Sequence, residues 1–308
     1  MHKLREVMKK ILVITLLCAG CILRGQEAVE KEEGPKEGWF TGGTFTFLFN
    51  QTAFKNWLAG GQNSIGGNVS ANYDLRYLRG NWNWDNKLIV SYGLTKTEGI
   101  DLRKTDDRLE FSSLLGKKTS SYWRYSFFFN FRTQFTSGFN YANDPDERFA
   151  TSGFLRPAYI SFGPGMAWEK TQLLKFNLSP ATSKITLIGN EVFRYDSSSG
   201  TFISSNERET FGVAPGDRLR YELGFYASGY FKFNLMKNVT AENIINLYTN
   251  YLENPQNIDM DYQLNIAMKI NEYLSTNIAF QTIYDDDAFP GFQLREVFGL
   301  GLNYSFKP

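Results

Sequence analysis

The chain of 308 residues has almost none of the side chains that acid–base and metal-dependent enzymes use most. Its single histidine is His2, and its two cysteines are Cys18 and Cys21, so all three lie at the N-terminus. Ser–His hydrolases need a histidine as general base, and zinc sites are built mainly from histidine and cysteine. We expect this N-terminal segment to be cleaved, so that the mature chain has no histidine and no cysteine. We therefore expect a protein that is not an enzyme and that has no cofactor, metal site or disulfide.

Long hydrophobic runs and a charge imbalance are also missing. No stretch reaches the roughly 18 consecutive apolar residues that indicate a transmembrane helix. The formal net charge of +1 gives the chain as a whole no attraction for nucleic acid. Aromatic residues, in contrast, make up 16% of the chain, although its mean hydropathy is only -0.35. This combination is expected when apolar and polar residues alternate, as they do in a transmembrane β-barrel.

The first residues have the pattern of an export signal. A basic region precedes a short apolar stretch at 11–17 and the small residues Ala19 and Gly20. We expect a signal peptide at 1–25 with cleavage before Gln26. Lipidation at Cys21 is the alternative to that cleavage, and Met8 is an alternative start to Met1. Residues 26–38 are charged and contain Gly and Pro, and we expect them to form a periplasmic tether.

After this segment, apolar and polar residues alternate repeatedly. At 121–135 one set of alternate positions is aromatic, including Trp123, Tyr125 and Phe127, and the other is polar. A period of two predicts a strand with one apolar and one polar face. Twelve strands are predicted in this way, at residues 39–51, 64–78, 81–95, 106–116, 121–135, 155–168, 173–188, 217–235, 239–252, 258–270, 273–284 and 293–306. Gly163-Pro164-Gly165 and Ser179-Pro180 interrupt the sixth and seventh, which predicts a bulge or a broken ladder there.

The connections between the predicted strands are sorted by length. Short ones, such as 79–80 and 236–238, alternate with longer ones, such as 136–154 and 189–216, and the short connection at 253–257 is the exception. Outer-membrane barrels have short turns at one end and long loops at the other, whereas a soluble sandwich has no such requirement. We therefore predict an all-β fold at residues 39–308: a closed, antiparallel, up-and-down transmembrane β-barrel of about 12 strands, with its first strand paired to its last.

The last predicted strand carries a further signal. Its apolar set is interrupted by Glu296, which we expect near the outer end of the strand, where a charge costs least. The strand ends in Gly301-x-x-Tyr304-x-Phe306. This ending resembles the C-terminal signal by which the barrel assembly machinery recognises outer-membrane barrels, and it implies that machinery as a partner.

One segment between the first two strands resembles a known family. Residues 50–64 contain Asn56-Trp57-x-x-Gly60-Gly61 and lead into a Tyr-rich strand. They are similar to the signature of an outer-membrane barrel family of Bacteroidota that is known only as a domain of unknown function. Ser179-Pro180 is a second point of similarity, and the resemblance covers most of 39–306. It implies the outer membrane of a Gram-negative bacterium and brings no established activity.

The polar faces of the strands supply candidate functional residues of both charges. The inward charged residues are Asp74, Arg76, Asp85, Lys87, Arg108, Glu110, Arg124, Arg132, Lys175, Arg220, Glu222, Lys232, Glu242, Asp259, Asp261, Lys269 and Arg295. Four of them are candidates for a lumen-facing basic lane for anionic solutes: Arg108, Arg124, Arg132 and Arg220. The alternative is a network of ion pairs that fills a narrow lumen.

The connections supply two weaker candidates. Asn56, Trp57, Gly60 and Gly61 are candidates for a loop that gates the lumen, with a plug-like structural loop as the alternative. The acidic clusters at 143–147 and 285–287 lack the spacing of a calcium loop, so we expect them to be solvated.

Two functions are compatible with these features. The sequence favours a small passive channel or transport barrel for small polar or anionic solutes. The alternative is a structural or assembly barrel with a closed lumen that docks an unidentified protein partner. Outer-membrane lipid is an expected partner in both cases, and nucleic acid in neither. The two differ in whether the lumen arginines are paired or face water.

Overall fold

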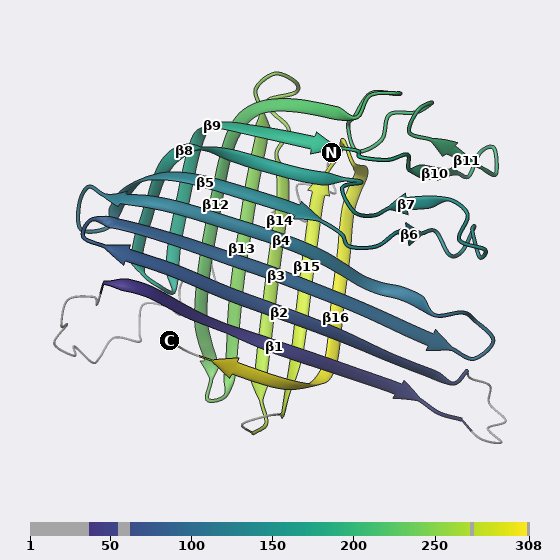
Figure 1. Ribbon diagram of the computed structural model, residues 1–308, viewed down its shortest axis with the longest axis horizontal. Helices are drawn as coiled ribbons and strands as arrows, with labels where there is room; N and C mark the ends of the chain where they lie inside the picture. Colours follow the sequence, from purple (N-terminus) through teal and green to yellow (C-terminus); the bar gives the residue numbers. More distant parts are fainter. Residues whose placement is uncertain (1–36, 55–61, 272–273, 307–308) are drawn as a thin grey trace, which may run out of the picture. The chain divides into compact units, whose positions relative to one another are not determined.

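The computed structural model describes residues 37–54, 62–271 and 274–306, and all regular structure within them is β (Figure 1). The expected signal peptide at 1–25, most of the tether at 26–38 and the candidate gate residues Asn56, Trp57, Gly60 and Gly61 lie outside the described residues. Within the described residues there is no helix of the length and apolarity that a membrane crossing requires.

Twelve strands form one closed antiparallel barrel, in which each strand pairs with two neighbours. They are β1 (Gly38–Thr52), β2 (Ser64–Arg79), β3 (Trp82–Thr97), β4 (Arg103–Lys118), β5 (Trp123–Thr133), β8 (Ala158–Thr171), β9 (Leu174–Leu187), β12 (Leu219–Met236), β13 (Val239–Asn250), β14 (Asp259–Lys269), β15 (Leu274–Asp285) and β16 (Phe289–Phe306). The barrel closes where β1 pairs with β16, from Gly43 opposite Phe306 to Phe49 opposite Leu300. The predicted fold class, strand number and closure are confirmed.

The position expected for Glu296 is wrong. The strand β16 begins at Phe289, four residues earlier than predicted from the alternation. Glu296 therefore lies well inside the strand, where it pairs with Phe280 of β15, and its side chain is exposed between Leu294 and Phe298.

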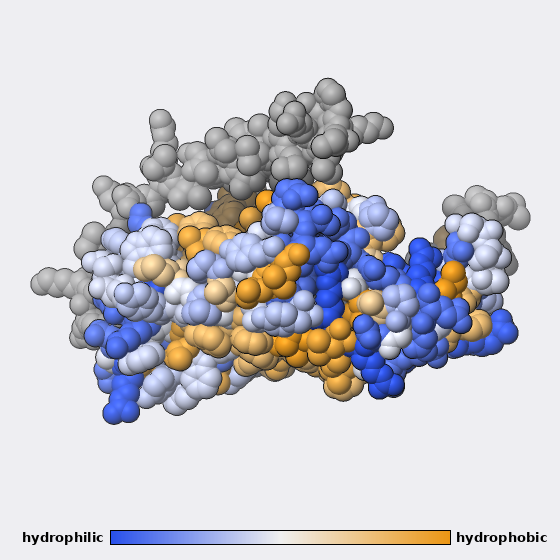
Figure 2. Space-filling model, turned by 90° about the horizontal axis from the view of Figure 1, so that it is seen from above, coloured by the Kyte–Doolittle hydropathy of each residue, from blue (hydrophilic) through white to orange (hydrophobic). Residues whose placement is uncertain are grey.

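Alternation along each strand decides which side chains line the lumen. In β5, Trp123, Tyr125 and Phe127 are exposed on the outside, whereas Ser126 and Phe128 are buried inside. The same holds around the barrel, so that rows of aromatic and aliphatic side chains cover its outer surface. Figure 2 shows apolar residues gathered across the middle of one face, with hydrophilic residues toward its right-hand end. An exposed apolar surface of this extent needs a membrane or a partner to cover it.

The two ends of the barrel differ in their connections. At one end, here called the short-turn end, Gly80 and Asn238 turn β2 into β3 and β12 into β13 with φ of 55° and 68°. Gly and Asn tolerate this left-handed conformation best. The other end, here called the long-loop end, holds the long connections, including those before β8 and before β12.

Two small hairpins at the long-loop end were not predicted. The strand β6 (Gly138–Phe139) pairs with β7 (Ala150–Ser152), and β10 (Phe193–Asp196) pairs with β11 (Thr201–Ser204), at the right of Figure 1. Strands this short show no readable alternation. They are ordered by packing, because the ring of Phe149 stacks on that of Phe202 at 4.7 Å.

The irregularity predicted for the sixth and seventh strands is confirmed. The register between β8 and β9 shifts between Phe162 and Met166, across Gly163-Pro164-Gly165. A Cβ atom on Gly165 would lie 2.3 Å from the carbonyl oxygen of Leu178, so only glycine fits there. The hydroxyl of Ser179 donates to the carbonyl of Pro164 at 2.5 Å, which fixes the bulge from the neighbouring strand.

Candidate functional site in the barrel lumen

Side chains from opposite walls of the barrel meet in its lumen. Lys87 Nζ on β3 lies 3.5 Å from Glu242 Oε1 on β13. Arg108 Nη2 on β4 donates to Gln263 Oε1 on β14 at 2.7 Å. In the ring of twelve strands, β3 and β13 are six places apart, and so are β4 and β14. Each pair therefore joins diametrically opposite strands and bridges the full width of the lumen.

Two of the predicted lumen arginines share one cluster. Arg108 Nη2 lies 2.6 Å from Glu110 Oε2, and Arg132 Nη1 lies 2.8 Å from Asp261 Oδ2. Asp261 Oδ1 also accepts a hydrogen bond of 2.9 Å from Gln281 Nε2. A buried charge without a partner costs several kcal/mol, so such pairing is what keeps these charges inside the barrel.

A second cluster joins β16 to β4. Arg295 donates through Nε and Nη2 to the two carboxylate oxygens of Asp106, at 3.0 and 2.6 Å. Asp106 also accepts hydrogen bonds from the side chains of Ser91 and Asn68. The bidentate geometry is the strongest form of an arginine–carboxylate pair, and it spans four places of the ring.

A third cluster lies at the short-turn end. The carboxylate of Glu169 forms ion pairs with three cations. Arg76 lies 3.2 Å away, Lys175 Nζ lies 3.7 Å away, and Arg124 is in closer contact. Asp85 lies 3.0 Å from Arg76 and 3.3 Å from Lys175. Three cations and two carboxylates from five strands are thus paired across this end of the lumen.

A fourth cluster surrounds Lys184 on β9. Its Nζ lies 3.0 Å from Asp259, 3.3 Å from Glu222 and 3.9 Å from Asp285. The ring of Tyr248 lies 4.8 Å below the ammonium group. Lys184 was missed from the sequence because Ser179-Pro180 breaks the alternation that would have assigned it to the inward set.

An aromatic contact also crosses the interior. Phe128 on β5 and Tyr226 on β12 stack with ring centroids 4.5 Å apart. The hydroxyl of Tyr226 donates to Asn246 at 2.7 Å and accepts from Asn130 at 3.1 Å. Phe128 and Tyr226 are both buried, so they fill this part of the lumen with a rigid apolar block.

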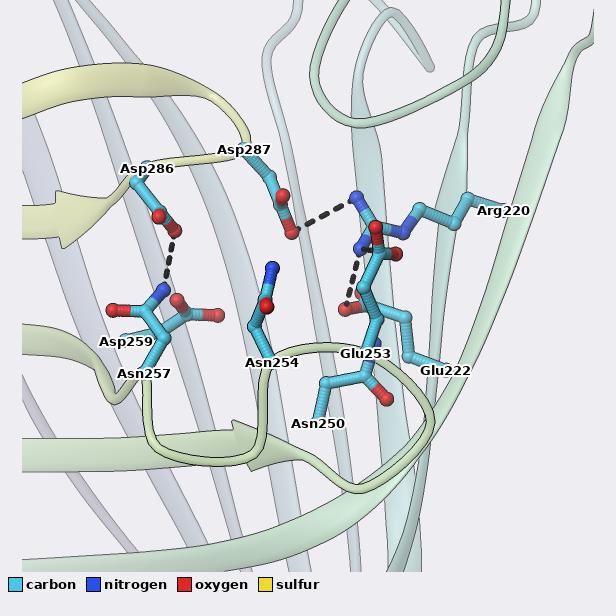
Figure 3. A pocket seen from close by; sticks show the side chains of 9 residues that line it. All are labelled: Arg220, Glu222, Asn250, Glu253, Asn254, Asn257, Asp259, Asp286 and Asp287. Carbon is cyan, nitrogen blue, oxygen red and sulfur yellow. Dashed lines mark hydrogen bonds and ion pairs between the residues drawn. The ribbon is translucent and has the colours of Figure 1, made fainter.

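A small polar hollow, open to solvent, lies at the long-loop end (Figure 3). Its lining residues are Arg220, Glu222, Asn250, Glu253, Asn254, Asn257, Asp259, Asp286 and Asp287. Arg220 lies 2.8 Å from Asp287 and 3.1 Å from Glu253. Burial raises the pKa of the Asp287 carboxyl above its ordinary value, against the opposing effect of Arg220. Neither this hollow nor any other group of the described residues gathers three or more metal-binding side chains into a metal site.

The four arginines of the predicted basic lane do not form one row. The structure brings Arg108 and Arg132 together, and it places Arg124 at the short-turn end and Arg220 in the hollow. Each of the four guanidinium groups lies in an ion pair with at least one carboxylate.

The C-terminal signal residues lie where the barrel closes. Gly301 pairs with Leu48 of β1, Tyr304 with Phe45, and Phe306 with Gly43. The ring of Phe306 lies 5.9 Å from that of Phe45. These residues therefore form part of the closing seam.

One family model matches part of the chain. A family model described as a protein of unknown function (DUF3078) matches residues 49–139, which confirms the resemblance to a domain of unknown function. The Bacteroidota origin stays a prediction. No curated protein matches the chain.

Several solved barrels are similar in fold. The translocator domain of the autotransporter NalP from Neisseria meningitidis is 8% identical, with a TM-score of 0.36 over 89% of this chain and 90% of that one. An outer membrane channel from Pseudomonas putida F1 is 8% identical, with a TM-score of 0.39 over 92% and 100%. The NanC porin is 12% identical, with a TM-score of 0.34 over 88% and 99%. The strand pairing itself, rather than these likenesses, establishes the closed barrel.

Proposed function

We propose that this chain is an outer-membrane β-barrel whose lumen is closed by its own side chains, and that it acts as a structural or interaction barrel. The observation that carries the proposal is the pair of contacts that bridge opposite walls, Lys87 to Glu242 and Arg108 to Gln263. An anion channel needs arginines that face water. Since all four candidate arginines are ion-paired, the geometry favours the closed lumen over the passive channel.

The membrane location is supported by the outer surface and by closure. Rows of aromatic side chains face outward, and the closed sheet has no free edge. Both features suit a bilayer, where every backbone group must be paired. The proposal includes export by the signal peptide at 1–25 and recognition of Gly301, Tyr304 and Phe306 by the barrel assembly machinery. The docking of a protein partner is assigned to the long-loop end, where the hairpins β6–β7 and β10–β11 form a packed surface.

Solute flux into liposomes tests the closed lumen. Proteoliposomes of the wild-type barrel are expected to swell in arabinose no faster than protein-free liposomes. A variant that removes the Lys87–Glu242 pair and Arg108 with its ion-pair partner Glu110 (K87S, E242S, R108S and E110S together) breaks both bridging contacts and is expected to admit the sugar. Swelling by the wild type at the rate of this variant would establish a channel instead.

Co-purification tests the interaction role. After mild solubilisation, the barrel is expected to elute with a partner in fixed ratio, and a variant with residues 193–204 of the β10–β11 hairpin replaced by a Gly-Ser linker is expected to lose it. Recovery of the wild type as a free monomer at every detergent concentration would count against docking.

A further inference from the structure

Basic side chains form a ring around the short-turn end. Six exposed basic side chains lie at or beside the turns there: Arg79, Lys117, Lys118, Lys170, Lys237 and Lys269. None of the six has an ion-pair partner among the described residues. They come from five different turns, so they are distributed around the circumference of the barrel.

Among the described residues, no carboxylate at the short-turn end pairs with this ring. Glu169 and Asp85 are paired inside the lumen, and Glu37 accepts a hydrogen bond of 2.7 Å from the backbone N–H of Gly80. The long-loop end has the opposite balance, as in the connection where Asp144, Asp146 and Glu147 stand beside Arg148. The described barrel is therefore polarised along its axis.

Tryptophan gathers at the same end. All five tryptophans that the structure describes lie at the short-turn end of their strands: Trp39, Trp82, Trp84, Trp123 and Trp168. Trp39 packs on Tyr77 at 4.8 Å between ring centroids, and Trp168 packs on Tyr122 at 6.3 Å. Tryptophan prefers the level of the lipid headgroups, where its ring is half in hydrocarbon and its N–H half in water.

A direct contact connects the cations to this belt. Lys117 Nζ lies 5.4 Å from the centroid of the Trp82 ring, which is cation–π distance. The ammonium group is therefore held at the rim of the aromatic belt. A long basic side chain in this position reaches outward along the ring surface to the phosphate level of a leaflet.

We infer that the short-turn end is a ring that binds the anionic headgroups of phospholipids in the adjoining leaflet. The inference rests on the proposed function in one respect, that the barrel spans a membrane. A lipid leaflet fits better than a soluble partner, because the six cations surround the barrel and share their level with the tryptophan belt. Each ammonium or guanidinium group near an anionic surface gains a favourable interaction that salt screens.

Energy transfer from tryptophan to headgroup-labelled lipid tests the inference. All proteins carry Trp57→Phe, so that emission comes from the five tryptophans of the belt. The barrel is inserted into phosphatidylcholine vesicles with a few per cent of dansyl-labelled phosphatidylglycerol or, separately, dansyl-labelled diacylglycerol, which has no phosphate and is neutral. The anionic probe is expected to be enriched at least about twofold over the neutral one, and the enrichment should vanish in 1 M NaCl.

Two variants distinguish the effect of this ring on lipid enrichment from the effect of the overall positive charge of the protein. Replacing the six cations by Gln is expected to bring the enrichment ratio to one. The matched control replaces six basic residues at the long-loop end by Gln and is expected to keep the enrichment: Lys96, Arg103, Arg148, Arg156, Arg208 and Arg218. Equal enrichment in both variants, or none in the wild type, would overturn the inference. Failure of the barrel to insert, judged by its heat-modifiable migration, would instead count against the proposed membrane location.

Discussion

Lys87 on β3 and Glu242 on β13 lie on diametrically opposite strands, and their charged groups approach to 3.5 Å. A lysine side chain alone does not reach across a wide pore. The contact therefore shows that the barrel is narrow at this level and that its walls are tied to each other through the lumen. Arg108 and Gln263 form a second contact between opposite strands. Polar side chains therefore cross-link the interior of the barrel.

A double-mutant cycle on this pair tests whether the tie stabilises the barrel. Lys87→Met leaves Glu242 without its cation and is expected to lower the free energy of unfolding by about 2–3 kcal/mol, since both side chains are partly exposed, at 25% and 18%. The double variant K87M/E242L is expected to lose less than the sum of the single losses. Urea unfolding in vesicles, followed by tryptophan fluorescence, gives the values. Additive losses would show that the two residues are not coupled.

The bulge in β8 predicts a sharp difference between two glycines. A methyl group on Gly165 meets the carbonyl oxygen of Leu178 at 2.3 Å, whereas one on Gly67 of β2 meets nothing closer than 3.6 Å. Gly165→Ala is therefore expected to cost about 1–3 kcal/mol, and Gly67→Ala almost nothing. Comparison of the two in the same unfolding assay is the measurement, and equal effects would contradict the tight packing of β8 on β9.

Acid is expected to loosen the hairpin β10–β11. Hydrogen bonds from the hydroxyl and backbone N–H of Ser198, with one from the Ser199 hydroxyl, lower the pKa of Asp196. A carboxyl group whose pKa is lower in the folded state stabilises that state at pH values above the unfolded pKa. This stabilisation is lost as the pH falls through the folded pKa. Pepsin cleavage beside Phe202 should therefore rise between about pH 4 and pH 2 in the wild type. Asp196→Asn cannot titrate, so its cleavage, corrected for pepsin activity, should stay level.

Glu296 offers a stabilising substitution. It is an exposed carboxylate on the outward apolar set, between Leu294 and Phe298. Glu296→Leu is expected to raise the free energy of unfolding in lipid by about 1–2 kcal/mol, since a charge on a lipid-facing position is costly. Glu207→Leu, in a connection at the long-loop end, is the control and should give no gain. A loss of stability in Glu296→Leu would place this position against a polar partner.

The walls of this barrel could be predicted from sequence because alternation is local. The run Trp123 to Phe135 shows its two faces without knowledge of any neighbour, and the same holds for most strands. The observed strand ends differ from the predicted ones by a few residues. In β16 the difference arises because pairing with β15 extends the strand through Pro290 and Gly291.

The lumen could be predicted only in part. Arg108 and Asp261 were assigned to the inward set, but their partners depend on which strands face each other around the closed ring. That relation is not local in sequence. The hairpins β6–β7 and β10–β11 depend on tertiary packing such as that of Phe149 on Phe202, for which a short strand leaves no periodic signal.

Single-channel recording in planar bilayers tests the central claim, the closed lumen, most directly. The wild-type barrel is expected to insert without producing conductance steps in 1 M KCl at moderate voltage. The variant that lacks Lys87, Glu242, Arg108 and Glu110 side chains, all replaced by Ser, is expected to produce steps of uniform size. Uniform steps from the wild type, equal to those of the variant, would contradict a lumen bridged from wall to wall.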